Sequence, residues 1–141
     1  MFFIKTERDN LTEEETILES QIQRQILDYL KSIDVDSWRQ NNNGIPWRRF
    51  TGLHGVHDIL GFFKPKHFPI ALFMTIEVKI PGKDMSEDQK NFAHMVRKNG
   101  HISFTARCVA DVQYAFTRLN TYTWGQWLNF MHENFKIPLA I

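Results

Sequence analysis

Apolar residues recur at helical spacing over the first third of the chain, after a polar lead-in that spans residues 1–11. The positions that form this stripe are Leu18, Ile22, Ile26, Tyr29, Leu30 and Ile33. Their spacing predicts a helix with one face against a core. Thr12 precedes three glutamates, so it is expected to cap this helix, with Glu15 completing a capping box. Residues 34–37 are expected to end the helix.

Three runs with the composition of strands follow. They are residues 45–50, 55–63 and 70–80. Residues 70–74 are apolar without a break, as expected of a strand that is covered on both faces. Pro46 is tolerated at the start of an edge strand, and Pro81 with Gly82 ends the third run. Ahead of these runs, residues 38–44 contain an Asn-Gly step that signals a turn.

The C-terminal half predicts a helix, a strand and two more helices, over residues 86–98, 101–109, 111–119 and 123–135. Ser86 is expected to cap the first of these helices with Gln89 as its capping-box partner, Asp111 to cap the second, and Thr123 to start the last. The last helix is apolar on more than one side, which favours core packing or, alternatively, a dimer interface. The element order αβββαβαα predicts an α/β fold with a mixed β-sheet flanked by helices.

Composition limits the classes of protein that this chain can be. Its 141 residues, 43% of them hydrophobic, suit a single folded domain over residues 1–141. A formal net charge of +1 gives no global basic field, so a surface for DNA must come from local clustering. A single cysteine, Cys108, fits a reducing compartment. With no signal peptide or transmembrane run expected, the prediction is a cytoplasmic protein that is not secreted and binds no membrane.

The chemistry centres on the end of the 70–80 strand. Side chains alternate along a strand, so Glu77 and Lys79 point to the same side. Eighteen residues separate Asp58 from Glu77, enough for a loop and an antiparallel return that brings the two acids together. Two carboxylates with open coordination positions suit Mg²⁺ or Mn²⁺, with the ammonium group of Lys79 nearby. The alternative is a structural ion pair between Glu77 and Lys79.

Other candidates carry two interpretations each. Glu19 lies at the edge of the first helix's apolar stripe, and the spacing alone favours a solvated rim residue over one drawn into a site. Trp38, Trp47 and their neighbouring arginines could hold phosphates and stack on bases, or simply form an exposed edge. His54 and His57 are spaced like half of a zinc site, but no matching second pair of ligands follows.

Taken together, these residues resemble the PD-(D/E)XK nuclease superfamily and, within it, the VRR-NUC domains. The matching segments are Glu19-Ser20-Gln21-Ile22-Gln23, Trp38-Arg39, Asn43-Gly44, Gly55-x-x-Asp58, Ile76-Glu77-Val78-Lys79, Gln89 and Gly100. The resemblance covers about residues 12–115 and leaves a C-terminal helical extension over about residues 120–141 unexplained. One departure is His57, where the family commonly has proline before the catalytic aspartate.

The resemblance implies a restriction-endonuclease-like core that hydrolyses phosphodiester bonds in DNA with Mg²⁺ or Mn²⁺. Asp58, Glu77 and the backbone carbonyl of Val78 would bind the metal. Glu19 would hold a metal-bound water or complete a second metal site. Lys79 would orient the attacking water and stabilise charge on the phosphate, and Gln89 would help to position them. The expected DNA contacts are Arg39, Asn43, Arg48, Arg49 and Lys83.

Members that resemble this chain suggest a homodimer that is selective for branched DNA such as Holliday junctions. Because fold does not fix substrate, a nickase, an exonuclease or a restriction-type nuclease of the same fold remains an alternative. A non-catalytic nucleic-acid-binding module is the alternative outside enzymes.

Overall fold

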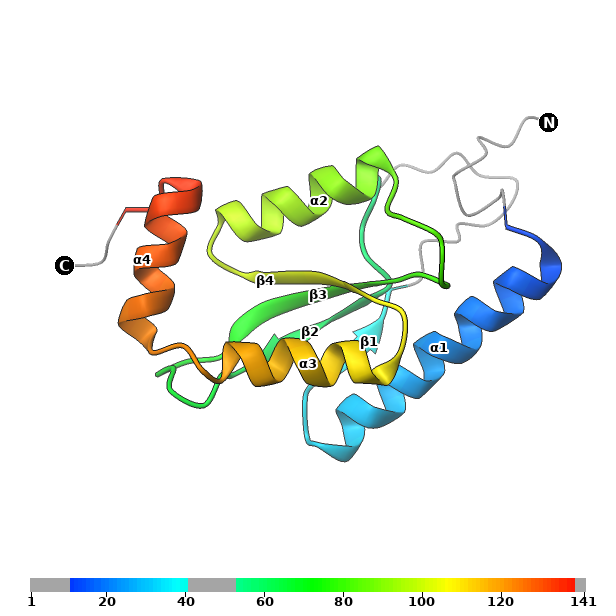
Figure 1. The fold of residues 1–141 in the computed structure, drawn as a ribbon, viewed down its shortest axis with the longest axis horizontal. Coiled ribbons are helices and arrows are strands. Elements are labelled where there is room, and N and C mark those ends of the chain that lie inside the picture. Colours follow the sequence, from blue (N-terminus) through cyan, green and yellow to red (C-terminus); the bar gives the residue numbers. More distant parts are fainter. Residues whose placement is uncertain (1–10, 41–52, 139–141) are drawn as a thin grey trace.

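The computed structural model describes residues 11–40 and 53–138. Its elements are α1 (Glu13–Ser32), β1 (Ser37–Arg39), β2 (Ile59–Phe63), β3 (Leu72–Val78), α2 (Glu87–Lys98), β4 (Ile102–Ala106), α3 (Val109–Leu119) and α4 (Trp124–Phe135). Together they form the predicted α/β architecture, a mixed sheet flanked by helices (Figure 1). Within these two ranges, no helix combines the length and the apolar character needed to cross a membrane.

The four strands lie side by side in the order β1-β2-β3-β4. The β1–β2 and β2–β3 pairs are antiparallel, whereas β3 and β4 run parallel and are joined through α2. Figure 1 shows α2 over one face of the sheet and α1 with α3 over the other, with α4 across the end where α2 finishes. Covered on both sides, β3 is almost wholly buried, as its unbroken apolar run predicts.

The main hydrophobic core lies on one side of β3, against α1 and α3. It includes Ile22, Ile26, Leu30, Ile59, Met74, Ile76, Val78, Ile102, Val112, Phe116, Trp127 and Met131. Phe63 of β2 and Phe116 of α3 stack with 3.8 Å between ring centroids. The core therefore ties α1, α3 and α4 to a single sheet, and it holds the polar end of β3 in a fixed position.

Local capping signals predicted several helix starts correctly. The side chain of Thr12 accepts a hydrogen bond from the N–H of Glu15 at the start of α1, but the capping box predicted with Glu15 is not complete. Ser86 and Thr123 form complete capping boxes at the starts of α2 and α4. These signals need only neighbouring residues, which is why sequence alone locates them.

Other expectations were wrong or lie outside the described residues. Residues 37–39 form β1, where only a helix end and a turn were expected. This strand approaches closely because Gly61 has no side chain: a Cβ atom there would lie 2.4 Å from the carbonyl oxygen of Asp36. The strand predicted at 45–50 lies in the stretch that the structure does not describe. The observed strands β2, β3 and β4 are also shorter than the runs 55–63, 70–80 and 101–109.

Two side-chain assignments in the helices need correction. Asp111 does not cap α3, because the N-cap residue is Cys108 and makes no side-chain cap hydrogen bond. Asp111 lies inside the first turn, where its Oδ2 accepts from the N–H of Arg107 at 2.8 Å. In α1 the buried apolar face is narrower than expected, since Leu18 and Ile33 are exposed.

Candidate active site

Asp58 and Glu77 meet where the antiparallel pair of β2 and β3 ends. Ile59 pairs with Ile76, so the same register places Asp58 opposite Glu77. The N–H of Asp58 donates to Glu77 Oε2 at 3.2 Å, and the N–H of Val78 donates to Asp58 Oδ2 at 2.8 Å. Each carboxylate thus contacts the strand end that carries the other, and both residues are buried. The proximity of Asp58 and Glu77, predicted from alternation and loop length, is confirmed.

Val78 directs its backbone toward the same point. A residue in a strand turns its N–H and C=O toward the same neighbouring strand, and the N–H of Val78 faces Asp58. Its carbonyl oxygen is therefore expected on the Asp58 side. The next residue, Lys79, faces the other way and donates its N–H to the carbonyl of Ala106 at 3.1 Å. The end of β3 accordingly offers a backbone oxygen beside two carboxylates.

Lys79 brings a buried positive charge to this end of the sheet. Its Nζ lies 3.8 Å from Glu77 Oε1, and both side chains are almost fully buried. That separation is an ionic contact but exceeds the length of a hydrogen bond. Both interpretations made from sequence, a structural ion pair and a catalytic lysine, require such proximity. The position of the ammonium group, in the low-dielectric end of β3, suits stabilisation of a negatively charged phosphate.

Glu19 is buried, so its interpretation as a solvated rim residue was wrong. Lys83 Nζ lies 3.6 Å from Glu15 Oε2, which places the first turn of α1 beside the loop that follows β3. Glu19 lies four residues further along, on the same helix face as Glu15. The start of α1 therefore faces the end of the sheet that carries Asp58 and Glu77.

Gln23 is a polar residue of the matching motif to which the sequence gave no role. It is buried, and its Nε2 donates to Glu19 Oε1 at 3.4 Å. Its Oε1 is buried without a hydrogen-bond partner among the described residues. An unsatisfied buried oxygen costs about 1–3 kcal/mol. A bound water or ion next to Glu19 would remove that cost, which makes Gln23 a further candidate for this site.

Gln89 makes the contacts of a capping residue. Its Oε1 accepts from the N–H of Ser86 at 2.9 Å, and its own N–H donates to Ser86 Oγ. The residue is buried at the start of α2. The capping interpretation is confirmed. A role for Gln89 in positioning water stays a prediction, and it would involve the side-chain amide nitrogen.

His57 contacts α2 and β3. Its ring lies 4.8 Å from that of Phe92, and its Nε2 lies 3.0 Å from the carbonyl oxygen of Gln89. A carbonyl only accepts, so Nε2 carries a proton. On the other side, Nδ1 lies 3.0 Å from Thr75 Oγ1, and Thr75 Oγ1 lies 2.7 Å from Ser103 Oγ. Sequence reasoning missed this polar network, which joins β3, β4 and α2.

Gly55 brings the loop before Asp58 against the start of α2. Its φ is +80°, and a Cβ atom there would lie 2.2 Å from the carbonyl oxygen of Asp88. Only glycine fits such a position. The Gly55-x-x-Asp58 spacing thus has a structural reason, because it positions both the aspartate and the histidine that precedes it.

The structure describes two of the residues expected to contact DNA. Arg39 lies on β1 and is exposed, and Lys83 is exposed in the loop after β3. Asn43, Arg48 and Arg49 fall within residues 41–52, which the structure does not describe. Both described residues lie at the end of the sheet that carries Asp58 and Glu77, since Arg39 pairs with Ile59 and Lys83 contacts Glu15.

The donor set fits a hard divalent cation better than zinc. Two carboxylates and a backbone carbonyl supply oxygen ligands of the kind that Mg²⁺ and Mn²⁺ prefer. In residues 11–40 and 53–138, no group of three His, Cys, Asp or Glu side chains is arranged to hold a metal ion. Both ring nitrogens of His57 lie within hydrogen-bonding distance of protein atoms, which argues against a zinc site built on His54 and His57.

Comparison of the chain with protein-family models, with curated proteins and with solved structures gave no match. The resemblance to a nuclease family therefore depends on the residues described above.

Proposed function

We propose that this chain is a Mg²⁺- or Mn²⁺-dependent DNA endonuclease of the PD-(D/E)XK superfamily, with the restriction-endonuclease-like core of the VRR-NUC domains. The proposal depends on one observation. Two buried carboxylates, Asp58 and Glu77, exchange hydrogen bonds with each other's strand ends, and the ammonium group of Lys79 lies beside them. Burying this many charges on a strand end is costly unless they are paired or bind a cation.

The roles follow from the chemistry of each group. Asp58, Glu77 and the carbonyl of Val78 would hold the cation. A divalent cation supplies Lewis-acid stabilisation of the negative charge on phosphate oxygens. The ammonium group of Lys79 has three donors and no acceptor, so in its charged form it orients a water molecule or a phosphate oxygen. Glu19 and Gln23 face this end of the sheet and would hold a water molecule through their side-chain oxygens.

The substrate that we propose is branched DNA such as a Holliday junction, bound by a homodimer. The support is indirect: the net charge of +1 is too small for a wholly basic molecule. Two protomers with local basic surfaces would meet a branched polyanion better than one. A nickase or an exonuclease would use the same metal ligands and differ in its loops, so the substrate must be found by experiment.

The test is a cleavage assay on labelled single-stranded, duplex, flap and four-way DNA, with Mg²⁺ or Mn²⁺. The wild-type chain is expected to cut at least one substrate and to lose activity in EDTA. Asp58→Asn is expected to abolish cleavage. Lys79→Ala is expected to lower the rate about 10²–10³-fold, the range for removing one charge-stabilising donor. Lys90→Ala, an exposed lysine on α2, is the matched control and should cut normally.

Two results would contradict the proposal. One is the absence of cleavage of any substrate beyond the level of Asp58→Asn. The other is full activity in Lys79→Ala. DNA binding without cleavage would favour the alternative of a non-catalytic nucleic-acid-binding module, in which Glu77 and Lys79 form only a structural ion pair.

A further inference from the structure

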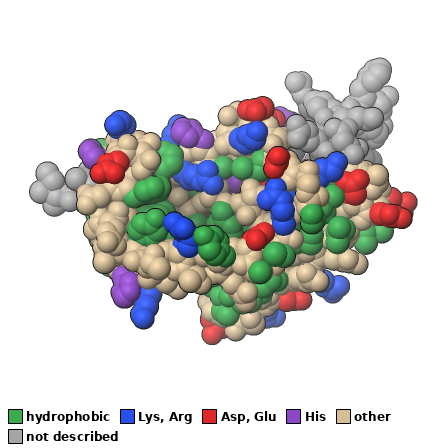
Figure 2. Space-filling view, viewed as in Figure 1, with side chains coloured by type: hydrophobic (Ala, Val, Ile, Leu, Met, Phe, Trp, Pro, Cys, Tyr) green, Lys and Arg blue, Asp and Glu red, His purple; other side chains and the backbone are tan. Residues whose placement is uncertain are grey.

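A groove of about 620 Å³ runs along β4 on the side away from β3. β4 is the outermost strand of the described sheet, and residues of α2, α3 and α4 line the groove around it. The view in Figure 2 looks onto this side of the molecule, where hydrophobic and basic side chains gather together over β4. The proposed active site does not use this surface.

The charged side chains that line the groove are mostly positive, and one of them, Arg107, forms an ion pair with Asp84. Arg97, Arg107 and Arg118 line it, against a single acid, Asp111. Arg118 donates to the hydroxyl of Tyr114, and its hydrogen bonds to Tyr114 and Tyr122 raise the pKa of Arg118 above its usual value. In a chain whose net charge is only +1, three arginines in one groove are a local concentration of charge.

The apolar lining of the groove is largely aromatic. Tyr114 is 64% exposed and Phe130 is 39% exposed, and the half-buried Phe104 of β4 also lines the groove. The guanidinium of Arg118 lies 5.9 Å from the centroid of the Tyr114 ring, and its Nη1 is 3.3 Å from the tyrosine hydroxyl. An exposed ring with a cation over it offers a face for stacking and a charge for a phosphate within one short stretch of helix.

Two other occupants fit this groove less well. A peptide that added a strand to β4 would need its outward carbonyl groups, but Arg97 donates both Nε and Nη2 to the carbonyl of Ser103, at 3.0 and 2.7 Å. A second copy of the chain in a two-fold contact would place the three arginines of one groove near the three of the other. Like charges that face one another across an interface are unfavourable.

We propose that the groove binds single-stranded DNA, with phosphates on Arg107 and Arg118 and bases stacked on Tyr114 and Phe104. A positive groove that carries aromatic side chains is the usual arrangement for binding single strands without sequence preference. Charge and shape favour this ligand, because a polyanion with planar bases complements both the arginines and the exposed rings.

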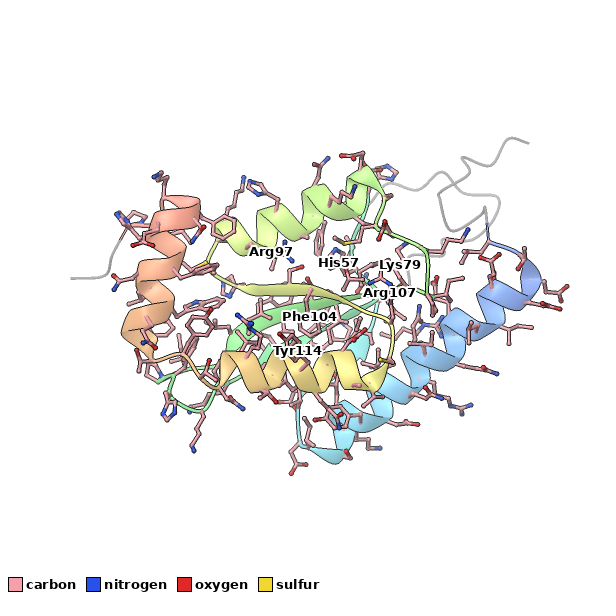
Figure 3. The ribbon with its side chains drawn as sticks, in the orientation of Figure 1. His57, Lys79, Arg97, Phe104, Arg107 and Tyr114 are labelled. Carbon is pink, nitrogen blue, oxygen red and sulfur yellow. The ribbon has the colours of Figure 1, made fainter. Side chains whose placement is uncertain are left out.

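The groove begins beside the candidate active site. Arg107 follows Ala106, whose carbonyl accepts the N–H of Lys79. The guanidinium of Arg107 is held there by hydrogen bonds to the carbonyl of Lys83 and to Asp84, at 2.7 and 3.0 Å. Figure 3 shows Lys79 and Arg107 toward one end of the sheet, and Phe104 and Tyr114 further along the groove. The bound strand would be the single-stranded arm of a branched substrate such as a flap, an identity that rests on the proposed function.

Binding is measured without cleavage, by fluorescence anisotropy in EDTA. The probe is a labelled single-stranded DNA of about twelve nucleotides, within the usual size of such sites. Tyr114→Ala is expected to weaken binding about tenfold, as the loss of one stacked base commonly does. Arg118→Ala is expected to reduce the slope of log K against log salt by about 0.7, the contribution of one phosphate contact. Arg24→Ala, an exposed arginine of α1 outside the groove, should bind like wild type.

The two proposals fail separately. The binding assay contains EDTA and needs no cleavage, so a wild-type chain that binds but never cuts contradicts only the nuclease function. Binding by Tyr114→Ala and Arg118→Ala at the level of Arg24→Ala would overturn the groove proposal, whatever the cleavage assay shows. Sedimentation is the second readout. A wild-type dimer that Tyr114→Ala dissociates would also overturn it, because the groove would then hold a second copy.

Discussion

Replacing Lys79 with methionine removes the buried ammonium group from the end of β3 and nearly preserves the shape of the side chain. In the wild type, Nζ lies 3.8 Å from Glu77 Oε1, and the exposed fractions of the two side chains are 8% and 0%. At that separation, an effective dielectric constant of about 20 gives an attraction of about 4 kcal/mol. Its loss leaves Glu77 buried beside Asp58 without its cation. We expect the metal-free variant to lose about 3–5 kcal/mol of its free energy of unfolding.

The chain supplies a matched control for burial. Lys90 Nζ lies 3.7 Å from Glu87 Oε1, nearly the same separation, but the two side chains are 54% and 85% exposed. Lys90→Met should therefore cost less than about 1 kcal/mol. The unfolding of both variants and of wild type in urea and EDTA is monitored by tryptophan fluorescence and circular dichroism. Lys79→Arg, which keeps the charge, is the variant to use if Lys79→Met does not fold.

A second arm of the same experiment adds Mn²⁺. A divalent cation between Asp58 and Glu77 would replace the lost positive charge, so Mn²⁺ should raise the stability of Lys79→Met at least as much as that of wild type. A loss for Lys79→Met no larger than that for Lys90→Met would refute the electrostatic argument. A large loss of stability in Lys79→Met, with no stabilisation of either protein by Mn²⁺, would mean that Glu77 and Lys79 form only a structural ion pair.

Two further outcomes follow from other parts of the fold. Gly55→Ala and Gly82→Ala both place a side chain at positive φ, which should cost each variant roughly 1–2 kcal/mol of its free energy of unfolding. Of the two, only the side chain at Gly55 would also meet backbone atoms, so Gly55→Ala should be the more destabilising in urea unfolding. Equal losses of stability would contradict the close approach of Gly55 to α2. Burial lowers the pKa of His101, whose Nδ1 accepts the N–H of Phe73. Because the unfolded state then binds more protons, stability should fall as pH drops below about 6.5; His101→Gln should flatten that slope, whereas replacing the exposed His94 should not.

Elements with local signals were predictable from sequence, and those that depend on distant partners were not. The capping boxes at Ser86 and Thr123 involve only residues three apart. β1 has three residues, and it exists because Gly61 lets the backbone at Asp36 come close. No pattern within 37–39 reveals that contact. Asp111 shows the limit of a local rule, since an aspartate near a helix start can serve a neighbouring N–H instead of the cap.

The candidate site, too, was predictable from sequence only in part. Alternation along β3 and the length of the loop after β2 were enough to bring Asp58 to Glu77. The burial of Glu19 was missed because helical spacing places it at the edge of the stripe, and only the packing of α1 shows that the edge faces the sheet end. The contacts of His57 involve Thr75 and a residue of α2, so they depend on the assembled fold.

The most direct test of the central claim is an anomalous diffraction measurement on crystals of the chain soaked in Mn²⁺. The claim is that Asp58 and Glu77 share one divalent cation at the end of β3. It predicts one anomalous peak about 2 Å from a carboxylate oxygen of each residue. A peak bound by only one of them, or no peak at this end of the sheet while the ion binds elsewhere, would contradict it.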